Sequence, residues 1–306
     1  MGYPKIRNLY QVPELATGLL GRVYCLEKIH GTSAHVSWHA DDLANTEDRP
    51  FEVSRGVVKF FSSGEKHDRF VALFDQEALK AAFVALGHPS VVVHGEAYGG
   101  KQQGMGKTYG PDLKFVAFDV KIGETWLSVP DAHDVVKKLG LEFVHYVEAP
   151  ATVESLDRER DMPSVQAVRN SMVDTPKIRE GIVIRPLIEL ARSDGSRVIA
   201  KHKRAEFSET ATPREVSPDK AVALADAQKI AAEWVTPMRL AHVMGGMVSL
   251  GGKIPTMSDT PAVIVAMIED IRAESKGEIN WDADKHGIEK AIGRATAKLF
   301  KESLQS

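Results

Sequence analysis

The chain reads Val23-Tyr24-Cys25-Leu26-Glu27-Lys28-Ile29-His30-Gly31-Thr32 near its start, where an apolar run typical of a β-strand leads directly into a lysine. Lys28 begins the pattern Lys-x-x-Gly, which also begins at Lys101, Lys107, Lys137 and Lys290. Only the context distinguishes Lys28, because it ends a predicted strand and is followed by a Thr-Ser turn and a second predicted strand. Lys28 is therefore a candidate functional residue only together with other residues of the chain that could act with it.

Further β-type stretches predict a mainly antiparallel sheet in the first two thirds of the chain. Short runs rich in Val, Ile, Phe and Tyr cover Arg22–Glu27, Ala34–His39, Val57–Phe61, Ser90–Gly95, Phe115–Lys121, Gly181–Pro186 and Val198–Lys203. Helical patterns lie between them, at Phe70–Leu86 and Asp131–Leu139. This alternation predicts an α+β fold.

From residue 217 onward the pattern is helical and no strand is predicted. Ser217-Pro218-Asp219 combines a capping hydroxyl, an early proline and an early carboxylate, and Thr260-Pro261 repeats the signal. Apolar stripes at helical spacing follow over Ile264–Ile271 and Ile288–Leu299. We expect an α+β domain over residues 1–210, a linker around Thr210–Val216 and a small all-helical domain over residues 217–306.

Composition indicates an ordinary soluble protein. The 306 residues are 43% hydrophobic, and the longest unbroken apolar run, Ala262–Ile268, is far shorter than the roughly 20 residues that span a bilayer. The 39 Lys and Arg against 42 Asp and Glu give a net charge of −3, which does not suggest a broadly basic nucleic-acid surface. The single cysteine, Cys25, excludes an intramolecular disulfide framework and is expected to be a buried thiol. No secretory signal is recognised, so we expect a cytoplasmic protein that does not enter membranes.

Two other patterns fail as ligand sites. Gly104-Met105-Gly106-Lys107-Thr108 resembles a phosphate-binding P-loop, but Lys101 stands where that motif requires its first glycine. We therefore expect a flexible loop over Gly99–Gly110. His35 and His39 share one face of a predicted strand, but two histidines without a third ligand make a poor metal site.

Charged and aromatic residues follow Lys28 in a definite order, mostly at predicted strand ends. The series is Lys28-Ile29-His30-Gly31, Ser54-Arg55-Gly56, His94-Gly95-Glu96, Phe118-Asp119, Arg179-Glu180-Gly181 and Lys201-His202-Lys203. This order resembles motifs I, Ia, III, IIIa, IV and V of the covalent nucleotidyltransferases, the superfamily of ligases and capping enzymes. The series is most similar to ATP-dependent RNA ligases of the RNA ligase 2 type. DNA ligases and capping enzymes usually carry aspartate where His30 stands.

The resemblance covers roughly residues 22–210 and carries expectations about architecture. It implies an antiparallel-sheet nucleotidyltransferase domain, ATP-grasp-like, followed in this subgroup by a small all-helical domain. DNA ligases and capping enzymes instead append a β-stranded OB-fold. The helical pattern over residues 217–306 favours the same subgroup independently.

The resemblance also implies a chemistry, in which RNA 3′-hydroxyl and 5′-phosphate ends are joined through lysyl-AMP and RNA-adenylate intermediates. Lys28 is the expected nucleophile. Lys201 and Lys203 stand on alternate residues of one predicted strand and so share a face. As neighbouring cations they would favour the neutral form of the Lys28 amine and stabilise charge that develops on the α-phosphate.

The remaining site residues are assigned by the same resemblance. Glu180 is expected to contact a divalent metal ion, Mg²⁺ or alternatively Mn²⁺. Glu96 is expected to accept a hydrogen bond from a ribose hydroxyl, and Phe118 to stack on the adenine of ATP. The other nucleotide-binding residues expected around the nucleophile are Glu27, Ile29, His30, Gly31, Arg55 and Asp119. A cationic cluster at Arg197 and Lys201–Arg204 would suit a polyanion.

The expected partner is therefore RNA with 3′-hydroxyl and 5′-phosphate ends, in particular a nicked duplex, bound by a monomer. Two alternatives remain open at this point. One is a DNA ligase or a capping-type nucleotidyltransferase. The other is a catalytically silent homologue that binds nucleotide or RNA.

Overall fold

The structure is a computed structural model that describes residues 2–40, 56–211, 226–251 and 254–305. The chain divides into two compact units, Met1–His202 and Lys203–Ser306, so this division precedes the linker expected at Thr210–Val216. Arg55 and the expected helix start at Ser217-Pro218-Asp219 lie outside the described residues. The two units are described separately below.

Every strand of the described residues starts in the first unit. The strands are β1 (Arg7–Asn8), β2 (Thr17–Lys28), β3 (Thr32–Ala40), β4 (Gly56–Ser62), β5 (Ser90–Tyr98), β6 (Lys114–Ile122), β7 (Thr125–Trp126), β8 (Tyr146–Thr152), β9 (Gly181–Pro186) and β10 (Ala200–Lys203). The helices of this unit are α1 (His67–Val71), α2 (Gln76–Leu86), α3 (Gly106–Tyr109), α4 (Val129–Lys138), α5 (Val153–Asp161) and α6 (Val165–Arg169). The predicted α+β class with mainly antiparallel sheet is confirmed.

Within the described residues, the strands form two five-stranded sheets. The first has the order β1-β10-β9-β2-β8, in which β2 is antiparallel to both neighbours and β1 is parallel to β10. The second has the order β4-β3-β5-β6-β7 and is antiparallel throughout. Because β2 belongs to the first sheet and β3 to the second, the loop Ile29–Gly31 joins the two sheets directly after Lys28.

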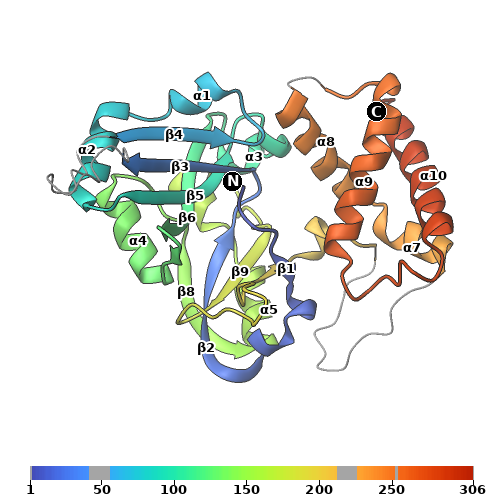
Figure 1. The fold of residues 1–306 in the computed structure, drawn as a ribbon, viewed down its shortest axis with the longest axis horizontal. Helices are drawn as coiled ribbons and strands as arrows, with labels where there is room; N and C mark the ends of the chain where they lie inside the picture. Colours follow the sequence, from blue (N-terminus) through green and yellow to red (C-terminus); the bar gives the residue numbers. More distant parts are fainter. Residues whose placement is uncertain (1, 41–55, 212–225, 252–253, 306) are drawn as a thin grey trace, which may run out of the picture. The chain divides into compact units, whose positions relative to one another are not determined.

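Helices cover one face of the second sheet, as Figure 1 shows for α2 and α4. Phe83 of α2 stacks on Trp38 of β3 with ring centroids 6.3 Å apart, and both side chains are fully buried. The helical pattern expected over Phe70–Leu86 is broken in the structure. Asp75 starts a new helix there, because its side chain accepts a hydrogen bond from the backbone N–H of Ala78.

Cys25 lies in the middle of β2, opposite Val147 on one side and Ile184 on the other. Only 2% of its surface is exposed, and burial raises the pKa of the thiol to about 12. The expected burial of this thiol is confirmed.

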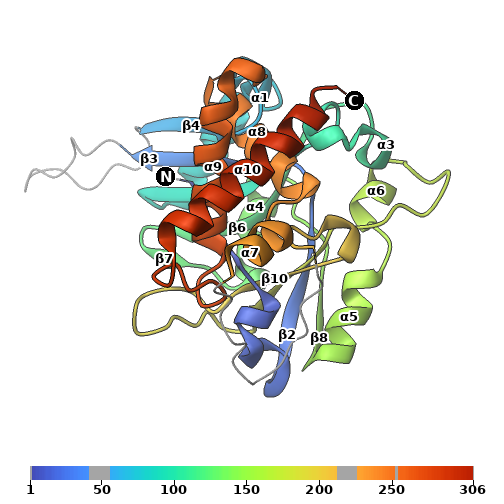
Figure 2. The same cartoon turned by 90° about the vertical axis from the view of Figure 1, so that its right-hand side faces the viewer.

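The second unit is helical over its described residues, with α7 (Ala227–Trp234), α8 (Pro237–Gly251), α9 (Thr260–Glu274) and α10 (Lys285–Ser303). Figure 2 shows α9 and α10 side by side. Their apolar faces share a core that includes Trp234, Met267, Ile271, Ile288 and Phe300. The all-helical character expected for the C-terminal region is confirmed. No helix among the described residues combines the length and apolarity needed to cross a membrane.

Candidate active site

The candidate nucleophile is held at the junction of two strands. Lys28 is the last residue of β2 and pairs with Gly181, the first residue of β9, so that Glu180 lies beside it. Lys28 Nζ donates a hydrogen bond to Glu180 Oε2 over 2.9 Å. The same oxygen lies 3.1 Å from His30 Nδ1. Three residues from two predicted motifs therefore meet at one carboxylate oxygen.

The burial of these groups differs in a way that suits a reactive amine. The Glu180 side chain is 1% exposed, whereas those of Lys28 and His30 are 22% and 18% exposed. A buried carboxylate that is bonded to two nitrogen groups has little freedom to move. The lysine amine is therefore oriented from the protein side while part of its surface stays open to solvent.

Gly31 fixes the turn that follows the nucleophile. A Cβ atom on Gly31 would lie 2.4 Å from the backbone oxygen of Ala97 and 2.9 Å from Cγ of Glu96, far inside normal contact distance. Only glycine therefore lets the loop approach β5 so closely. This approach places Glu96, the expected ribose acceptor, next to the Lys-x-x-Gly loop.

Tyr109 supports the same loop and was not identified from the sequence. The backbone N–H of His30 donates to the Tyr109 hydroxyl over 3.3 Å, and burial raises the pKa of this phenol well above its usual range. Tyr109 belongs to α3, within the segment Gly99–Gly110 that was expected to be a flexible loop. The sequence carried no signal for this contact, because the two residues are 79 positions apart.

Glu27 does not lie with its neighbour Lys28, because successive side chains of a strand point to opposite faces. Its carboxylate accepts hydrogen bonds from Ser164 Oγ (2.5 Å) and from the backbone N–H groups of Val165 (3.0 Å) and Gln166 (3.2 Å). These groups form the start of α6, where a negative charge is favoured. The expected orientation of Glu27 toward base or phosphates is thus replaced by an anchor behind the nucleophile. Ile29 is likewise in the core, at 4% exposure.

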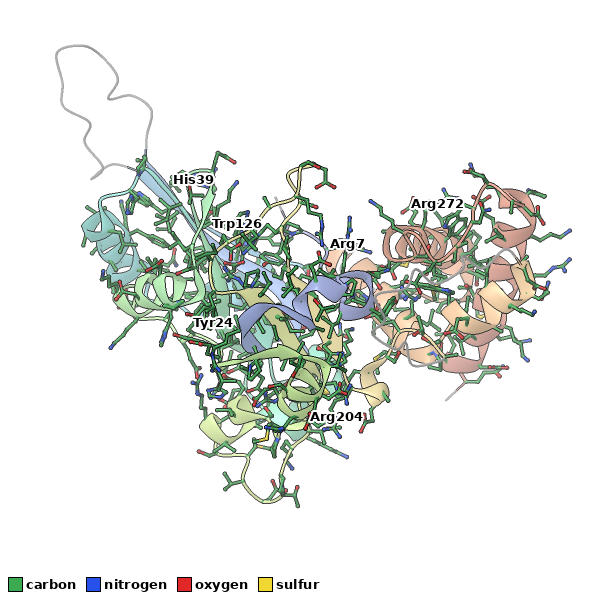
Figure 3. All side chains as sticks on the ribbon, turned by 90° about the horizontal axis from the view of Figure 1, so that it is seen from below. Arg7, Tyr24, His39, Trp126, Arg204 and Arg272 are labelled. Carbon is green, nitrogen blue, oxygen red and sulfur yellow. The ribbon has the colours of Figure 1, made fainter. Side chains whose placement is uncertain are left out.

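Phe118, the expected adenine-stacking residue, lies in an aromatic cluster around Tyr3. The Tyr3 ring packs edge to face against Phe118 at 4.9 Å between centroids, and also contacts His94 at 5.1 Å and Trp126 at 5.6 Å. Trp126 is labelled in Figure 3. Burial lowers the pKa of His94 to about 4, so its ring is neutral near pH 7. No sequence pattern had indicated that Tyr3 would contact this region.

Asp119 joins the two sheets instead of lying open beside Phe118. It is fully buried and bonds Arg185 on β9 over 2.9 Å and Arg197 over 2.6 Å. Tyr3 donates a hydrogen bond to the same carboxylate over 2.7 Å, and Glu189 bonds both arginines. We therefore assign Asp119 a structural role in this conformation, because its charge is matched by two guanidinium groups.

The expected cationic cluster is largely neutralised in the described part of the chain. Arg197 bonds Asp119, His202 Nε2 lies 2.6 Å from Asp157, Arg204 (labelled in Figure 3) lies 3.3 Å from Glu206, and Lys203 bonds Glu209. Burial also lowers the pKa of His202, so its ring adds little charge. The cluster is thus a set of local ion pairs and not an open basic surface.

Lys201 and Lys203 share one face of β10, as the sequence predicted from their alternation. Lys201 is 8% exposed and pairs in register with Asn8 of β1. In the first sheet β9 separates β10 from β2, which places Lys201 two strands away from the strand that ends in Lys28. Near Lys28, Glu180 is the carboxylate predicted to contact a metal ion, and oxygen ligands of this kind suit Mg²⁺ or Mn²⁺ bound together with phosphates.

Comparison with known proteins gives one family. The model for the RNA ligase family matches residues 21–203, more than half of the chain. No curated protein matches. Similar solved structures include the Naegleria gruberi RNA ligase with PPi, at 15% identity and a TM-score of 0.49, and a mutant of that ligase with AMP and Mn, at 16% identity and a TM-score of 0.48. Each match covers 68% of this chain and 57% of the other, so the chain spans less than two thirds of those proteins.

Proposed function

Since the chain belongs to the RNA ligase family, we propose that it is an ATP-dependent RNA ligase that joins 3′-hydroxyl and 5′-phosphate ends. The observation that carries this proposal is the meeting of Lys28, His30 and Glu180 at one carboxylate oxygen. Lys28 and His30 belong to the Lys-x-x-Gly motif, and Glu180 directly precedes β9, 152 positions after Lys28, yet the three lie within bonding distance.

The proposed reaction has three phosphoryl transfers. The neutral Lys28 amine attacks the α-phosphorus of ATP, a P–N bond forms, and the bond to pyrophosphate breaks. The 5′-phosphate oxygen of the RNA then attacks the lysyl-AMP and takes over the AMP, which restores the lysine. Finally the 3′-hydroxyl attacks the activated 5′-phosphate, and AMP leaves.

The residues of the chain mainly position groups and stabilise charge in this scheme, as is usual for phosphoryl transfer. Glu180 and His30 would hold the Lys28 amine in line with the α-phosphate. Lys201 and Lys203 would stabilise the charge on its oxygens, Glu96 would accept from the ribose, and Phe118 would stack on adenine. A divalent metal ion held by Glu180 and the phosphates would offset the triphosphate charge when bound.

A nicked duplex is the proposed substrate form, and a monomer the proposed acting species. The helical character of the second unit supports the nicked duplex as substrate, because a small all-helical domain also follows the catalytic domain in the RNA ligase 2 type, which the motif order resembles. The arrangement of ion pairs around Arg197–Arg204 supports contact over a small zone near the ends to be joined.

The test is adenylylation with α-labelled ATP and Mg²⁺ or Mn²⁺. The wild-type chain should form a covalent AMP adduct, and Lys28→Ala should not. Lys137→Ala is the matched control, because Lys137 begins the same Lys-x-x-Gly pattern on the exposed surface of α4. An absent adduct in the wild-type chain, or an undiminished adduct in Lys28→Ala, would refute the proposal.

Substrate choice is tested separately. Labelled GTP in place of ATP distinguishes a capping-type enzyme, and nicked DNA in place of nicked RNA distinguishes a DNA ligase. We expect ATP and nicked RNA to be preferred. Nucleotide binding without any adduct would indicate the catalytically silent homologue.

A further inference from the structure

We propose that Glu209 is a positioning residue for Lys203 and sets the rate at which lysyl-AMP forms. This inference rests on the proposed function, because Lys203 acts on a phosphate only if the chain reacts with ATP. It concerns a residue that follows the matched family region, which ends at residue 203.

The contact between the two residues is a desolvated ion pair. The Lys203 ammonium donates to Glu209 Oε1, and the two side chains are only 12% and 8% exposed. Ion pairs that are shielded from water are screened little and have well-defined geometry. A lysine ammonium has three N–H donors, so a bond to Glu209 is compatible with donation to a phosphate oxygen.

Glu209 is itself fixed by a buried arginine of the helical unit. The backbone oxygen of Glu209 accepts from Arg239 Nε and from Thr236 Oγ1, both over 3.3 Å. Its carboxylate Oε2 lies 3.7 Å from Arg239 Nη2. The Arg239 guanidinium is completely buried and stacks over Trp234 at 5.1 Å. Glu209 therefore offers Lys203 an acceptor whose own position is determined on two sides.

Two further carboxylates complete the anchor. Asp270 and Glu274, both on α9, bond the Arg239 guanidinium. This arrangement leaves a chain of contacts from Lys203 through Glu209 and Arg239 to α9.

The cluster could alternatively be interpreted as a metal centre. Glu209, His242 and Asp270 each bring one ligand atom within 4.8 Å of the others. However, Lys203 and Arg239 already bond these carboxylates, and a divalent ion would then lie close to two buried cations. This distribution of charges favours the ion pair between the Lys203 ammonium and Glu209 over a metal site.

The experiment measures single-turnover formation of lysyl-AMP in Glu209→Gln and Glu209→Asp. If Glu209 orients Lys203 for the transition state, Glu209→Gln should lower the maximal rate roughly 10- to 100-fold while the apparent KM for ATP changes much less. Glu209→Asp keeps the charge and should recover part of the rate. Equal losses in both variants, or a rise in KM without a loss of maximal rate, would overturn the proposal.

Two matched controls separate positioning from general destabilisation. Glu206→Gln removes a carboxylate from the exposed pair with Arg204. Glu289→Gln removes a carboxylate from the pair with Arg272 on the helical unit. Both should retain nearly the wild-type rate. A loss in either control as large as that in Glu209→Gln would mean that general destabilisation of this unit lowers the rate, and would overturn the proposal.

A second readout does not depend on ligase activity. Limited acetylation with acetic anhydride followed by mass spectrometry should label Lys203 roughly tenfold faster in Glu209→Gln than in wild type, relative to Lys59 on β4. Unchanged labelling of Lys203 would overturn the positioning role. Faster labelling of Lys203 in Glu209→Gln, together with no AMP adduct in the wild-type chain, would support the pairing and refute the proposed ligase function instead.

Discussion

Lys28 Nζ lies 2.9 Å from Glu180 Oε2, across the pairing of β2 with β9. The two residues stand 152 positions apart, and the carboxylate is almost completely buried. The bond orients the amine and keeps it close to a negative charge. Loss of that charge should therefore affect the first chemical step directly.

We expect Glu180→Gln to lower the rate of lysyl-AMP formation by about 10- to 100-fold, because a charge-assisted hydrogen bond contributes about 1.5–3 kcal/mol. The measurement is adduct formation at saturating ATP. Glu148→Gln, which removes a carboxylate from an exposed pair with Arg22, is the control and should keep the wild-type rate. Equal rates for the two variants would exclude a role for Glu180 in this step.

Gly31→Ala should lower the same rate by about 100-fold, because its Cβ would collide with the backbone of Ala97 at 2.4 Å and displace the loop that carries His30. Gly246→Ala is the control, since a Cβ at that helical position meets nothing within 4 Å. Adduct formation and a thermal melt should be measured on both. A Gly31→Ala protein with the wild-type rate would show that the close approach to β5 is unnecessary.

Asp119→Asn should destabilise the first unit by about 3 kcal/mol, because it removes the fully buried one of the two carboxylates, Asp119 and Glu189, that Arg185 and Arg197 share. Chemical denaturation gives the free energy of unfolding. Glu124→Gln removes a carboxylate from a pair on the surface with Lys121 and should have little effect. If Asp119→Asn melts like wild type but binds ATP poorly, then Asp119 acts in nucleotide binding as the sequence suggested.

Stability should fall in mild acid because of His94. Burial lowers its folded-state pKa from 6.5 to about 4, so the unfolded chain binds more protons between these two values. The contribution is fully present above about pH 6.5, and it is lost as the pH falls through about 4. We expect a loss of about 2 kcal/mol at pH 5 relative to pH 8 from this one group.

Denaturation of wild type and His94→Phe at pH 8 and pH 5 tests this expectation. The phenyl ring can occupy the same aromatic cluster with Tyr3 and Trp126, but it does not titrate. The variant should therefore lose less stability on acidification than wild type does. His88→Gln, at an exposed position, should behave like wild type, and an identical pH response in all three proteins would contradict the prediction.

RNA binding should depend only moderately on salt. Arg197, His202, Lys203 and Arg204 are each paired with a carboxylate, so few of these cations are available to replace counterions on the RNA. We expect a slope of log K against log salt concentration of about −2 to −3, which corresponds to three or four phosphate contacts. Binding titrations with nicked RNA at several salt concentrations give the slope, and a value near −8 would require an extended basic surface.

The sequence predicted the central strands well. The bounds of β9 were predicted to the residue, Gly181–Pro186, because the strand is apolar and buried along most of its length. β8 was not predicted. It lies at the edge of its sheet and contains Pro150, and its buried positions, Ala149 and Ala151, are small residues that give no strong strand pattern in the sequence.

The site residues that belong to ordered motifs could be predicted from the sequence. The contacts that these residues make with partners far away in the chain could not. Lys28, His30 and Glu180 were found from their order along the chain, and the structure brings them together. The burial of Asp119 between two arginines could not be foreseen, because its partners lie 66 and 78 positions away and no local pattern links them. The hydrogen bond of Tyr3 to Asp119 could not be predicted for the same reason, because the two residues are 116 positions apart.

The buried thiol in β2 has a practical consequence for spectroscopy. Since Cys25 is buried and its thiol stays protonated near neutral pH, thiol-reactive dyes should not label the unmodified chain. A cysteine introduced at an exposed site such as Leu19, which is 79% exposed, would then be the preferred point of attachment. Single-molecule fluorescence with such a label could test the proposed adenylylation without removal of Cys25.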